Sequence, residues 1–524
     1  MRILVFHGYL LRGTGSNVYN ASLAAALARL GHEVHLVCQE RAPEQLDFVD
    51  SVGDWDGGAL QLRELRTPVR CTTYRPDIGG LLPVYVADRY EQIEARPFPE
   101  LTDAQLDDYL SRNVDAVREV AARVRPDVAL ANHLVMGPLI LARALADSRV
   151  PYAVKVHGSA LEYTVKPHPR FLPHAREGIA GARAVLVGSR HTAESLWAAL
   201  DDPSLPSRTR LGPPGVDVAA FTPREPAAAA DGLRALVDRL RAEHAPERDG
   251  DETDTSAFVR DPAAAAAALG SLVDASDPLV AFVGKLIVSK GVDLLLAAWP
   301  LVLAVHPRAR LVVVGFGAYR EAAERLLACL AGGDLAGARE LAAAGRAAEG
   351  GERGELHYLA AFLDRLDANP ASRADYLAAA RALHESVTFT GRLEHGELVD
   401  LLPACDALVV PSTFPESFGM VAAEAAACGV LPVSADHSGL AEVTRVLAAG
   451  LPAEARPWLS LGLGPGAVEG LAERLNAWLA APEGLREEAR AALVETARER
   501  YSWEGVASGV LAAAEGRLDE LDPP

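Results

Sequence analysis

The chain has 524 residues, half of them hydrophobic, and a formal net charge of -20 at neutral pH. This length exceeds what one hydrophobic core usually organises, so we expect two large domains. The acidic balance argues against a nucleic-acid surface, because such a surface needs clustered cations. The five cysteines are scattered without paired spacing, which indicates neither a disulfide framework nor a zinc site and fits a reducing compartment.

The amino-terminal segment enters an apolar strand directly, without the apolar core and cleavage site of a secretory signal. No apolar run reaches the roughly 18 to 20 residues that span a bilayer. We therefore expect a cytoplasmic protein without a transmembrane segment.

The first half of the chain alternates short apolar runs with Ala/Leu-rich stretches. A strand at 3–6, a helix near 16–30 and a strand at 33–37 form the first such unit. This alternation is typical of βαβ units and a parallel sheet. Further strands are expected at 128–131, 152–156 and 184–188. Residues 1–223 are thus predicted to form an α/β, Rossmann-like domain, with ligands at the carboxyl ends of its strands.

Composition changes after residue 223. Residues 224–277 carry alanine runs, prolines and an acidic stretch at 247–254, which predicts a linker or a partly disordered insertion. A second α/β series follows over 278–500, with strands expected at 279–283, 310–314, 387–390, 407–410 and 431–434. Within it, residues 317–386 show helical composition and no strand, which predicts a helical insertion. The final segment, about 501–524, is expected to form a helix that packs back on the first domain.

Two glutamates near a predicted strand-to-helix turn carry the first chemical signal. Glu416 follows the strand at 407–410, and Glu424 falls about two turns inside a helix expected over 418–427. Two helical turns rise by roughly 11 to 12 Å, which suits two hydroxylated groups joined by a diphosphate. The helix start between them offers unpaired N–H groups to phosphates. The alternative is that Glu416 caps the helix and Glu424 is a solvated surface residue.

Two lysines strengthen the first interpretation. Lys285 and Lys290 follow the strand at 279–283, in a loop that should open at the carboxyl edge of the second sheet. Lysines in this place can neutralise a leaving diphosphate. A lysine at a strand end is more often an exposed charge when it stands alone, but here it accompanies the glutamate pair.

Together these segments resemble the large retaining GT-B glycosyltransferase family called family 4, or glycosyl transferases group 1, whose mark is two glutamates separated by seven residues. The resemblance also covers 31–34, 214–217, 387–394 and 502–504. It implies two Rossmann-like domains that face a central cleft, an acceptor domain over 1–223 and a nucleotide-sugar donor domain over 278–500. It further implies a nucleotide-diphosphate sugar as donor, transfer with retention, and no metal or other cofactor.

The resemblance implies roles for individual residues. Glu416 would contact the donor sugar, Glu424 the ribose, and Lys285 and Lys290 the diphosphate; the family usually has arginine at the position of Lys285. His157 resembles the family histidine near the reacting sugar. The other donor-binding candidates are positions near the sugar and phosphates (Ser417, Phe418, Gly419, Met420), beside the base (Gly391, Arg392, Leu393) and in the first glycine-rich loop (Gly13, Gly15).

Two other functions fit parts of the sequence. A nicotinamide-dependent enzyme would use the loop Gly13-Thr-Gly-Ser-Asn-Val18, but Val18 replaces the third glycine of that motif. A non-catalytic protein that binds nucleotide sugars would keep the same glutamates and lysines. Activity, or its absence, separates this last function from a transferase.

The acceptor leaves two interpretations open. Residues 155–191 hold six Lys/Arg against two acidic residues, which indicates either an anionic or lipid-linked acceptor, with peripheral membrane contact, or an ordinary solvated face. The short motif Asp54-Trp-Asp56 is expected in a solvated turn rather than at a metal. The sequence predicts neither the base and sugar of the donor nor the acceptor.

Overall fold

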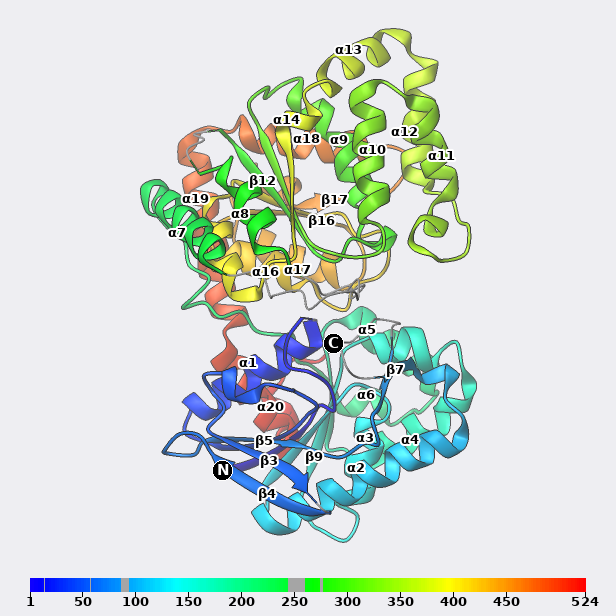
Figure 1. Ribbon diagram of the computed structural model, residues 1–524, viewed down its shortest axis with the longest axis vertical. Coiled ribbons are helices and arrows are strands. Elements are labelled where there is room, and N and C mark those ends of the chain that lie inside the picture. Colours follow the sequence, from blue (N-terminus) through cyan, green and yellow to red (C-terminus); the bar gives the residue numbers. More distant parts are fainter. Residues whose placement is uncertain (14, 57, 86–93, 244–259, 274–276) are drawn as a thin grey trace. The chain divides into compact units, whose positions relative to one another are not determined.

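The computed structural model describes residues 1–524 except 14, 57, 86–93, 244–259 and 274–276. The chain forms two compact units (Figure 1). Unit 1 contains Met1–Gly215 and Tyr501–Pro524, and unit 2 contains Val216–Arg500. The division therefore falls before the expected boundary at 223, and the last helix belongs to unit 1.

The described residues of unit 1 form a nine-stranded sheet with the order β11-β10-β9-β8-β1-β2-β5-β3-β4. Its strands are β1 (Arg2–Phe6), β2 (Glu33–Val37), β3 (Ser51–Asp56), β4 (Ala59–Glu64), β5 (Cys71–Arg75), β8 (Val128–Asn132), β9 (Tyr152–Val156), β10 (Ala184–Val187) and β11 (Thr209–Leu211). Neighbours pair in parallel, except that β3 and β4 form an antiparallel hairpin. A separate parallel pair joins β6 (Leu81–Val84) to β7 (Glu94–Pro97).

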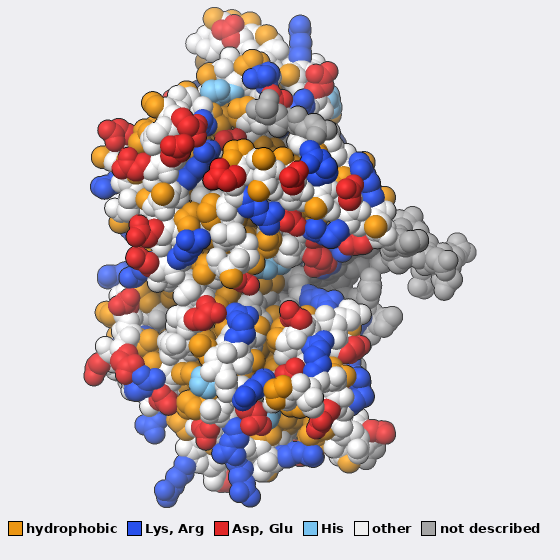
Figure 2. Space-filling model, turned by 90° about the vertical axis from the view of Figure 1, so that its left-hand side faces the viewer, with side chains coloured by type: hydrophobic (Ala, Val, Ile, Leu, Met, Phe, Trp, Pro, Cys, Tyr) orange, Lys and Arg blue, Asp and Glu red, His pale blue; other side chains and the backbone are white. Residues whose placement is uncertain are grey.

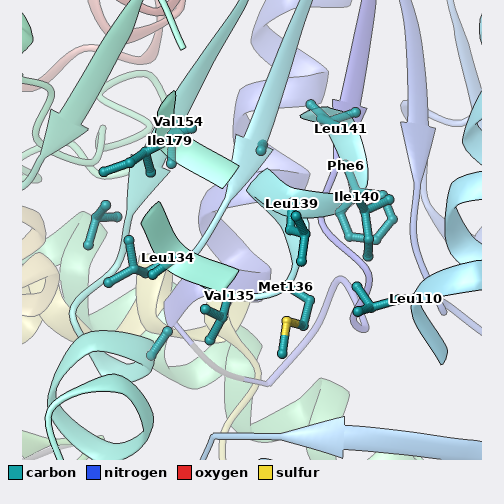
Figure 3. Packing of buried hydrophobic residues seen from close by; sticks show 14 of the residues in the cluster. Phe6, Leu110, Leu134, Val135, Met136, Leu139, Ile140, Leu141, Val154 and Ile179 are labelled. Atoms are coloured by element: carbon teal, nitrogen blue, oxygen red, sulfur yellow. The ribbon is translucent and has the colours of Figure 1, made fainter. Parts of the chain in front are cut away.

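Helices cover both faces of this sheet because the side chains of its central strands are apolar on both sides. Ile3 and Val5 pack in one cluster with α1 (Gly15–Arg29) and α20 (Trp503–Glu515). Leu4 and Phe6 pack in the other, which Figure 3 shows filled by side chains of β1, β9 and the helices behind them. The helices of that face include α2 (Asp103–Val124), α3 (Gly137–Ala144), α4 (Leu172–Ala180), α5 (Arg190–Leu200) and α6 (Leu205–Arg208).

The hairpin β3–β4 corrects one expectation. Asp54 and Asp56 lie in β3 and not in a solvated turn, and Asp54 Oδ1 accepts a hydrogen bond from Arg75 Nε at 2.8 Å. The glycine and aspartates suggested a turn, but strand pairing at the sheet edge prevails. Asp54 is therefore the partner of an arginine.

Unit 2 contains a six-stranded parallel sheet with the order β14-β13-β12-β15-β16-β17 among its described residues. The strands are β12 (Leu279–Val283), β13 (Arg310–Val314), β14 (Val387–Gly391), β15 (Ala407–Val410), β16 (Leu431–Ala435) and β17 (Ser460–Leu461). The helices that connect and cover them are α9 (Val292–Leu303), α14 (Leu383–Ser386), α15 (Leu398–Leu401), α16 (Met420–Ala427), α17 (Ser438–Ala449), α18 (Ala467–Leu479) and α19 (Glu483–Tyr501). The prediction of two α/β, Rossmann-like parts is confirmed.

The described parts of 224–277 differ from the expected linker. Helix α7 (Pro226–Ala242) buries Leu233, Leu236, Val237 and Leu240. That spacing makes an apolar stripe along one helix face. Helix α8 (Pro262–Gly270) packs against α7 and β14, so both helices are part of unit 2. The acidic stretch at 247–254 lies outside the described residues.

The insertion at 317–386 is helical, as its composition predicts. It contains α10 (Arg320–Gly332), α11 (Leu335–Ala344), α12 (His357–Ala368) and α13 (Pro370–Ala380), which stand together at one end of unit 2 in Figure 1. Short 3₁₀ turns connect several elements, among them Arg346–Glu349. Of the helices that the structure describes, none has the length and apolar composition to cross a membrane.

Candidate active site

The loop between β12 and α9 carries Lys285 and Lys290. Gly291, the next residue, has a φ of +68°, and a side-chain carbon there would overlap the carbonyl oxygen of Pro411. Only glycine permits this close approach. The Thr413 N–H donates to the Ser289 carbonyl at 2.9 Å, so the loop lies against the segment that follows β15.

This approach brings Lys290 to Glu416. The Lys290 ammonium donates to Glu416 Oε1, and the Ser412 hydroxyl donates to the same oxygen at 2.7 Å. The Glu416 N–H donates to Ser438 Oγ at 2.9 Å. Burial on its own would raise the pKa of the Glu416 carboxyl, but Lys290 and the Ser412 hydroxyl lower it below its ordinary value. Glu416 is thus held ionised beside an ammonium group.

Glu424 lies in the second turn of α16 with 2% of its surface exposed. The helix begins at Met420, after Gly419, and in the described part of the chain no side chain caps its first N–H groups. The alternative interpretation of the two glutamates is therefore wrong, because Glu416 does not cap the helix and Glu424 is not solvated.

His395 is the partner of Glu424, and sequence reasoning missed it. Its Nε2 lies 2.8 Å from Glu424 Oε1, and its ring lies 5.2 Å from the ring of Phe221. Burial lowers the pKa of His395, but Glu424, followed by Asp217 and Glu394, raises it above its ordinary value. The Glu424 carboxylate therefore favours the protonated form of the imidazole that lies against it.

Lys285 lies in the same loop as Lys290 but has different neighbours. Its ammonium lies 5.9 Å from the ring centre of Phe316, and the guanidinium of Arg392 lies 5.8 Å from the same ring. Arg392 also donates to Glu394 Oε1 at 2.9 Å. Gly391 ends β14 with a φ of +74°, and Leu393 is buried. The structure thus groups Lys285 with the residues expected beside the base.

The segment before α16 is closely packed. A side-chain carbon at Gly439 would lie 2.5 Å from the Ser417 carbonyl, and Phe418 is buried. The side chains of Ser417 and Met420 and the backbone of Gly419 are only partly covered. Ser417, Phe418, Gly419 and Met420 therefore form a compact turn between Glu416 and Glu424.

In unit 1, the glycine loop leads into α1. Gly13 has a φ of +90°, and both Gly13 and Gly15 are exposed. Two residues further on, Asn17 Nδ2 donates to the Arg12 carbonyl at 2.7 Å, and its Oδ1 lies 3.0 Å from His7 Nε2. The loop is therefore anchored to the end of β1.

His157 belongs to a row of three histidines, and sequence reasoning missed the other two. His7, His133 and His157 each follow directly after β1, β8 and β9, which are adjacent in the sheet. The rings of His7 and His133 lie 5.6 Å apart, and those of His133 and His157 lie 4.9 Å apart. His157 Nε2 lies 2.8 Å from Asn132 Oδ1. The shared position after each strand would have identified the row.

Burial removes charge from this row. It lowers the pKa of His7 to about 4 and holds the pKa of His133 and of His157 well below the ordinary value. Lys155 lies beneath Tyr19 with 2% of its surface exposed, and burial lowers its pKa to about 7. In the residues that the structure describes, no group of three or more His, Cys, Asp or Glu is arranged to hold a metal ion.

The cations of 155–191 are largely committed to contacts within unit 1. Lys155 donates to the Gly212 carbonyl, Lys166 pairs with Glu162 at 2.6 Å, and Arg176 donates to the Leu200 carbonyl at 2.9 Å. Arg170 donates to backbone carbonyls, and Arg190 pairs with Glu194. Figure 2 shows another face of the molecule, on which acidic and basic side chains are likewise interspersed. Lys155 is buried, but the other cations of the segment are exposed, which favours the solvated-face interpretation for them.

Two family models match the chain. The model described as "Glycosyl transferase 4-like domain" matches residues 14–201, and "Glycosyl transferases group 1" matches residues 367–500. These segments contain His157, His395, Glu416 and Glu424. Gly13, Lys285 and Lys290 lie outside them.

A curated relative, D-inositol 3-phosphate glycosyltransferase of Segniliparus rotundus, is 31% identical over 49% of this chain and 44% of its own length. The chain thus spans less than half the length of this relative. Sucrose-phosphate synthase from Thermosynechococcus elongatus has a similar structure, with a TM-score of 0.55, 18% identity and 99% of each chain covered. Anabaena HepE, in complex with UDP and glucose, gives a TM-score of 0.55 and 16% identity over 98% of this chain and 99% of its own.

Proposed function

The chain belongs to the group 1, or family 4, glycosyltransferases of the GT-B fold, and we propose that it transfers a sugar from a nucleotide-diphosphate sugar to an acceptor hydroxyl. The observation that carries this proposal is the geometry around α16. A carboxylate paired with a lysine stands before the helix, and a buried carboxylate paired with a histidine stands inside it.

We assign the two carboxylates to opposite ends of the donor. Glu416 would accept hydroxyl protons of the sugar, and Glu424 those of the ribose, because carboxylates are strong acceptors for hydroxyl donors. The N–H groups at the start of α16 would meet the phosphates between them. Lys290 would neutralise the leaving diphosphate, and Lys285 would add a second positive charge from the side of Phe316 and Arg392.

We further propose that transfer retains the anomeric configuration. Two carboxylates that flank a scissile bond would suggest a glycosidase mechanism. Glu416 and Glu424 are instead separated along one turn and helix, so neither is assigned as a nucleophile. The chain's contribution is then positional and electrostatic: Lys290, Lys285 and the helix N–H groups stabilise the departing diphosphate. The role of His157 beside the reacting sugar stays a prediction from the family resemblance.

Metal independence is part of the proposal. The positive charge for the leaving group comes from lysines, so we expect sugar transfer to continue in EDTA. A rate that collapses in EDTA and returns with Mg²⁺ or Mn²⁺ would contradict this part alone.

One experiment tests the function and the donor together. The purified protein is screened with UDP-, GDP- and ADP-sugars for release of nucleoside diphosphate, with a mixture of acceptors that includes inositol phosphate and phosphatidylinositol. These acceptors are chosen because curated relatives are named for D-inositol 3-phosphate and for a phosphatidylinositol monomannoside. Release and sugar transfer with one donor class support the proposal. Binding of a nucleotide sugar without turnover would favour the non-catalytic alternative, and binding of NAD instead would favour the nicotinamide enzyme.

A further inference from the structure

Glu349, in the helical insertion of unit 2, contacts the loop between β12 and α9 that carries Lys285 and Lys290. Glu349 ends the 3₁₀ turn Arg346–Glu349, between α11 and α12. Its Oε2 accepts the backbone N–H of Val288 at 2.7 Å. Val288 lies between Lys285 and Lys290, so the insertion contacts the middle of the loop that carries both lysines. The Glu349 side chain is 12% exposed, which places this contact away from bulk water.

The turn that presents Glu349 is itself fixed. Arg346 Nε donates to Glu349 Oε1 at 3.3 Å, so protein donors engage both carboxylate oxygens. Gly345 has a φ of +51° and forms a bridge to Gly354, where a side-chain carbon would overlap the Gly354 carbonyl. The Gly351 N–H donates to the Arg346 carbonyl at 2.9 Å. These two backbone contacts tie residues 345–354 into a compact loop, which holds the Glu349 carboxylate in place.

The start of the insertion secures the same loop from another side. The Leu286 N–H donates to the Phe316 carbonyl at 2.7 Å, and the Leu286 carbonyl accepts the Tyr319 N–H at 2.9 Å. These bonds hold the first half of the loop, beside Lys285. The Glu349 carboxylate holds its centre with a charge-assisted hydrogen bond, which is stronger than a bond between neutral groups.

We propose that Glu349 is a positioning residue for donor binding, through which the insertion sets the place of Lys285 and Lys290. The proposal rests on the assignment of those lysines to the diphosphate. Glu349 lies outside both segments that the family models match, so this support comes from the chain's own insertion. Its loss should let the loop fluctuate and lower affinity for the diphosphate, while Glu416 and Glu424 stay in place.

The test compares Glu349→Ala with Glu349→Gln, whose amide oxygen can still accept the Val288 N–H. Glu352→Ala is the matched control, because Glu352 is an exposed carboxylate of the same segment. Amide hydrogen exchange is measured on the nucleotide-free protein over residues 284–291. Because hydrogen bonds to charged groups are among the stronger ones, we expect exchange at Val288 to rise roughly tenfold or more in Glu349→Ala. Glu349→Gln should restore most of the protection, and Glu352→Ala should match the parent protein.

Binding of UDP, GDP and ADP is then measured by calorimetry on the same variants, and the donor KM and kcat are measured separately. Glu349→Ala should weaken binding of the preferred nucleotide and raise the donor KM about tenfold, with a smaller change in kcat. Unchanged exchange at Val288, or faster exchange with unchanged nucleotide affinity, would overturn the positioning role. A parent protein that binds none of the three nucleotides would overturn the donor assignment, and the exchange data would still decide whether Glu349 holds the loop.

Discussion

The two units differ in how they hold the ionisable groups of their candidate sites. In unit 2, partners of opposite sign lower the pKa of the partly buried Glu416 carboxyl and raise the pKa of His395, which favours the charged form of each group. In unit 1, burial strips the charge from His7, His133 and His157 and lowers the pKa of Lys155 to about 7. Unit 2 therefore offers fixed charges and unit 1 neutral hydrogen-bonding groups.

This difference matches the roles that we propose for the two units, in which unit 2 binds the nucleotide-sugar donor and unit 1 the acceptor. A diphosphate needs compensating charges that are already in place, because reorganisation during the reaction would raise the barrier. Changes that remove a charge from unit 2 should consequently have larger effects than changes that test the neutrality of unit 1.

The largest effect is expected for the pair Lys290 and Glu416. Lys290→Ala and Glu416→Gln should each lower kcat/KM about a hundredfold, comparable to the loss of one preorganised charge-stabilising group. Lys166→Ala, which breaks an exposed pair with Glu162 in unit 1, serves as the control and should leave the rate unchanged. Folded Lys290 or Glu416 variants with undiminished sugar transfer would contradict the assignment of these two residues to the donor.

A smaller loss is expected at His395. His395→Phe keeps an aromatic ring beside Phe221 but removes the charged partner of Glu424, and should weaken nucleotide binding about tenfold. Because the pKa of His395 is raised, the charged pair is complete below pH 6.5 and is lost as the pH rises through the raised value. The parent protein should therefore lose nucleotide affinity with rising pH, as followed by calorimetry. Equal pH dependence in parent and variant would show that another group is responsible.

A modest effect on stability is expected at Lys155. Its pKa is lowered, so between pH 7 and its ordinary range the unfolded chain binds a proton that the folded protein does not. Stability should then rise with pH, by at most about 1.4 kcal/mol per pH unit from this group. Lys155→Met removes that contribution. Thermal unfolding at pH 7 and pH 9 should show a larger upward shift in the parent protein, and identical shifts would contradict the lowered pKa.

The smallest effect is expected at His157, which should not titrate near neutrality. Its imidazole ¹⁵N resonances should keep the neutral pattern from pH 8 to pH 6, because burial and then His133 hold its pKa well below the ordinary value. The exposed His357 is an internal reference that is free of such burial. Protonation of His157 at pH 6 would contradict the contrast between neutral histidines in unit 1 and charged groups in unit 2.

The sequence predicted the central strands well, because they are short apolar runs bounded by turns. β2, β9, β12, β13 and β15 have the expected bounds. The edge hairpin β3–β4 escaped prediction because its exposed face carries polar residues and only pairing defines it. Strand β5 escaped prediction because it contains two threonines and an arginine, although most of it is buried. The helix α7 was hidden by its alanines and prolines, although Leu233, Leu236, Val237 and Leu240 do form a helical stripe.

The site was predicted unevenly for a related reason. Glu416, Glu424 and Lys290 stand in motifs with recognisable spacing. Their partners do not: Ser412 and His395 reach the carboxylates, and Ser438 reaches the Glu416 N–H, only through the fold. Glu349 is the extreme case, because its contact with Val288 joins residues 61 apart in the chain and no local pattern marks it.

The most direct test of the central claim measures binding of a bare nucleoside diphosphate and of the matching nucleotide sugar to two variants. If Glu424 holds the ribose and Glu416 the sugar, Glu424→Gln weakens both ligands by the same factor, whereas Glu416→Gln weakens the nucleotide sugar and spares the nucleoside diphosphate. Equal losses for both ligands in Glu416→Gln, or no loss of nucleoside diphosphate in Glu424→Gln, would contradict the assignment of the two glutamates to opposite ends of the donor.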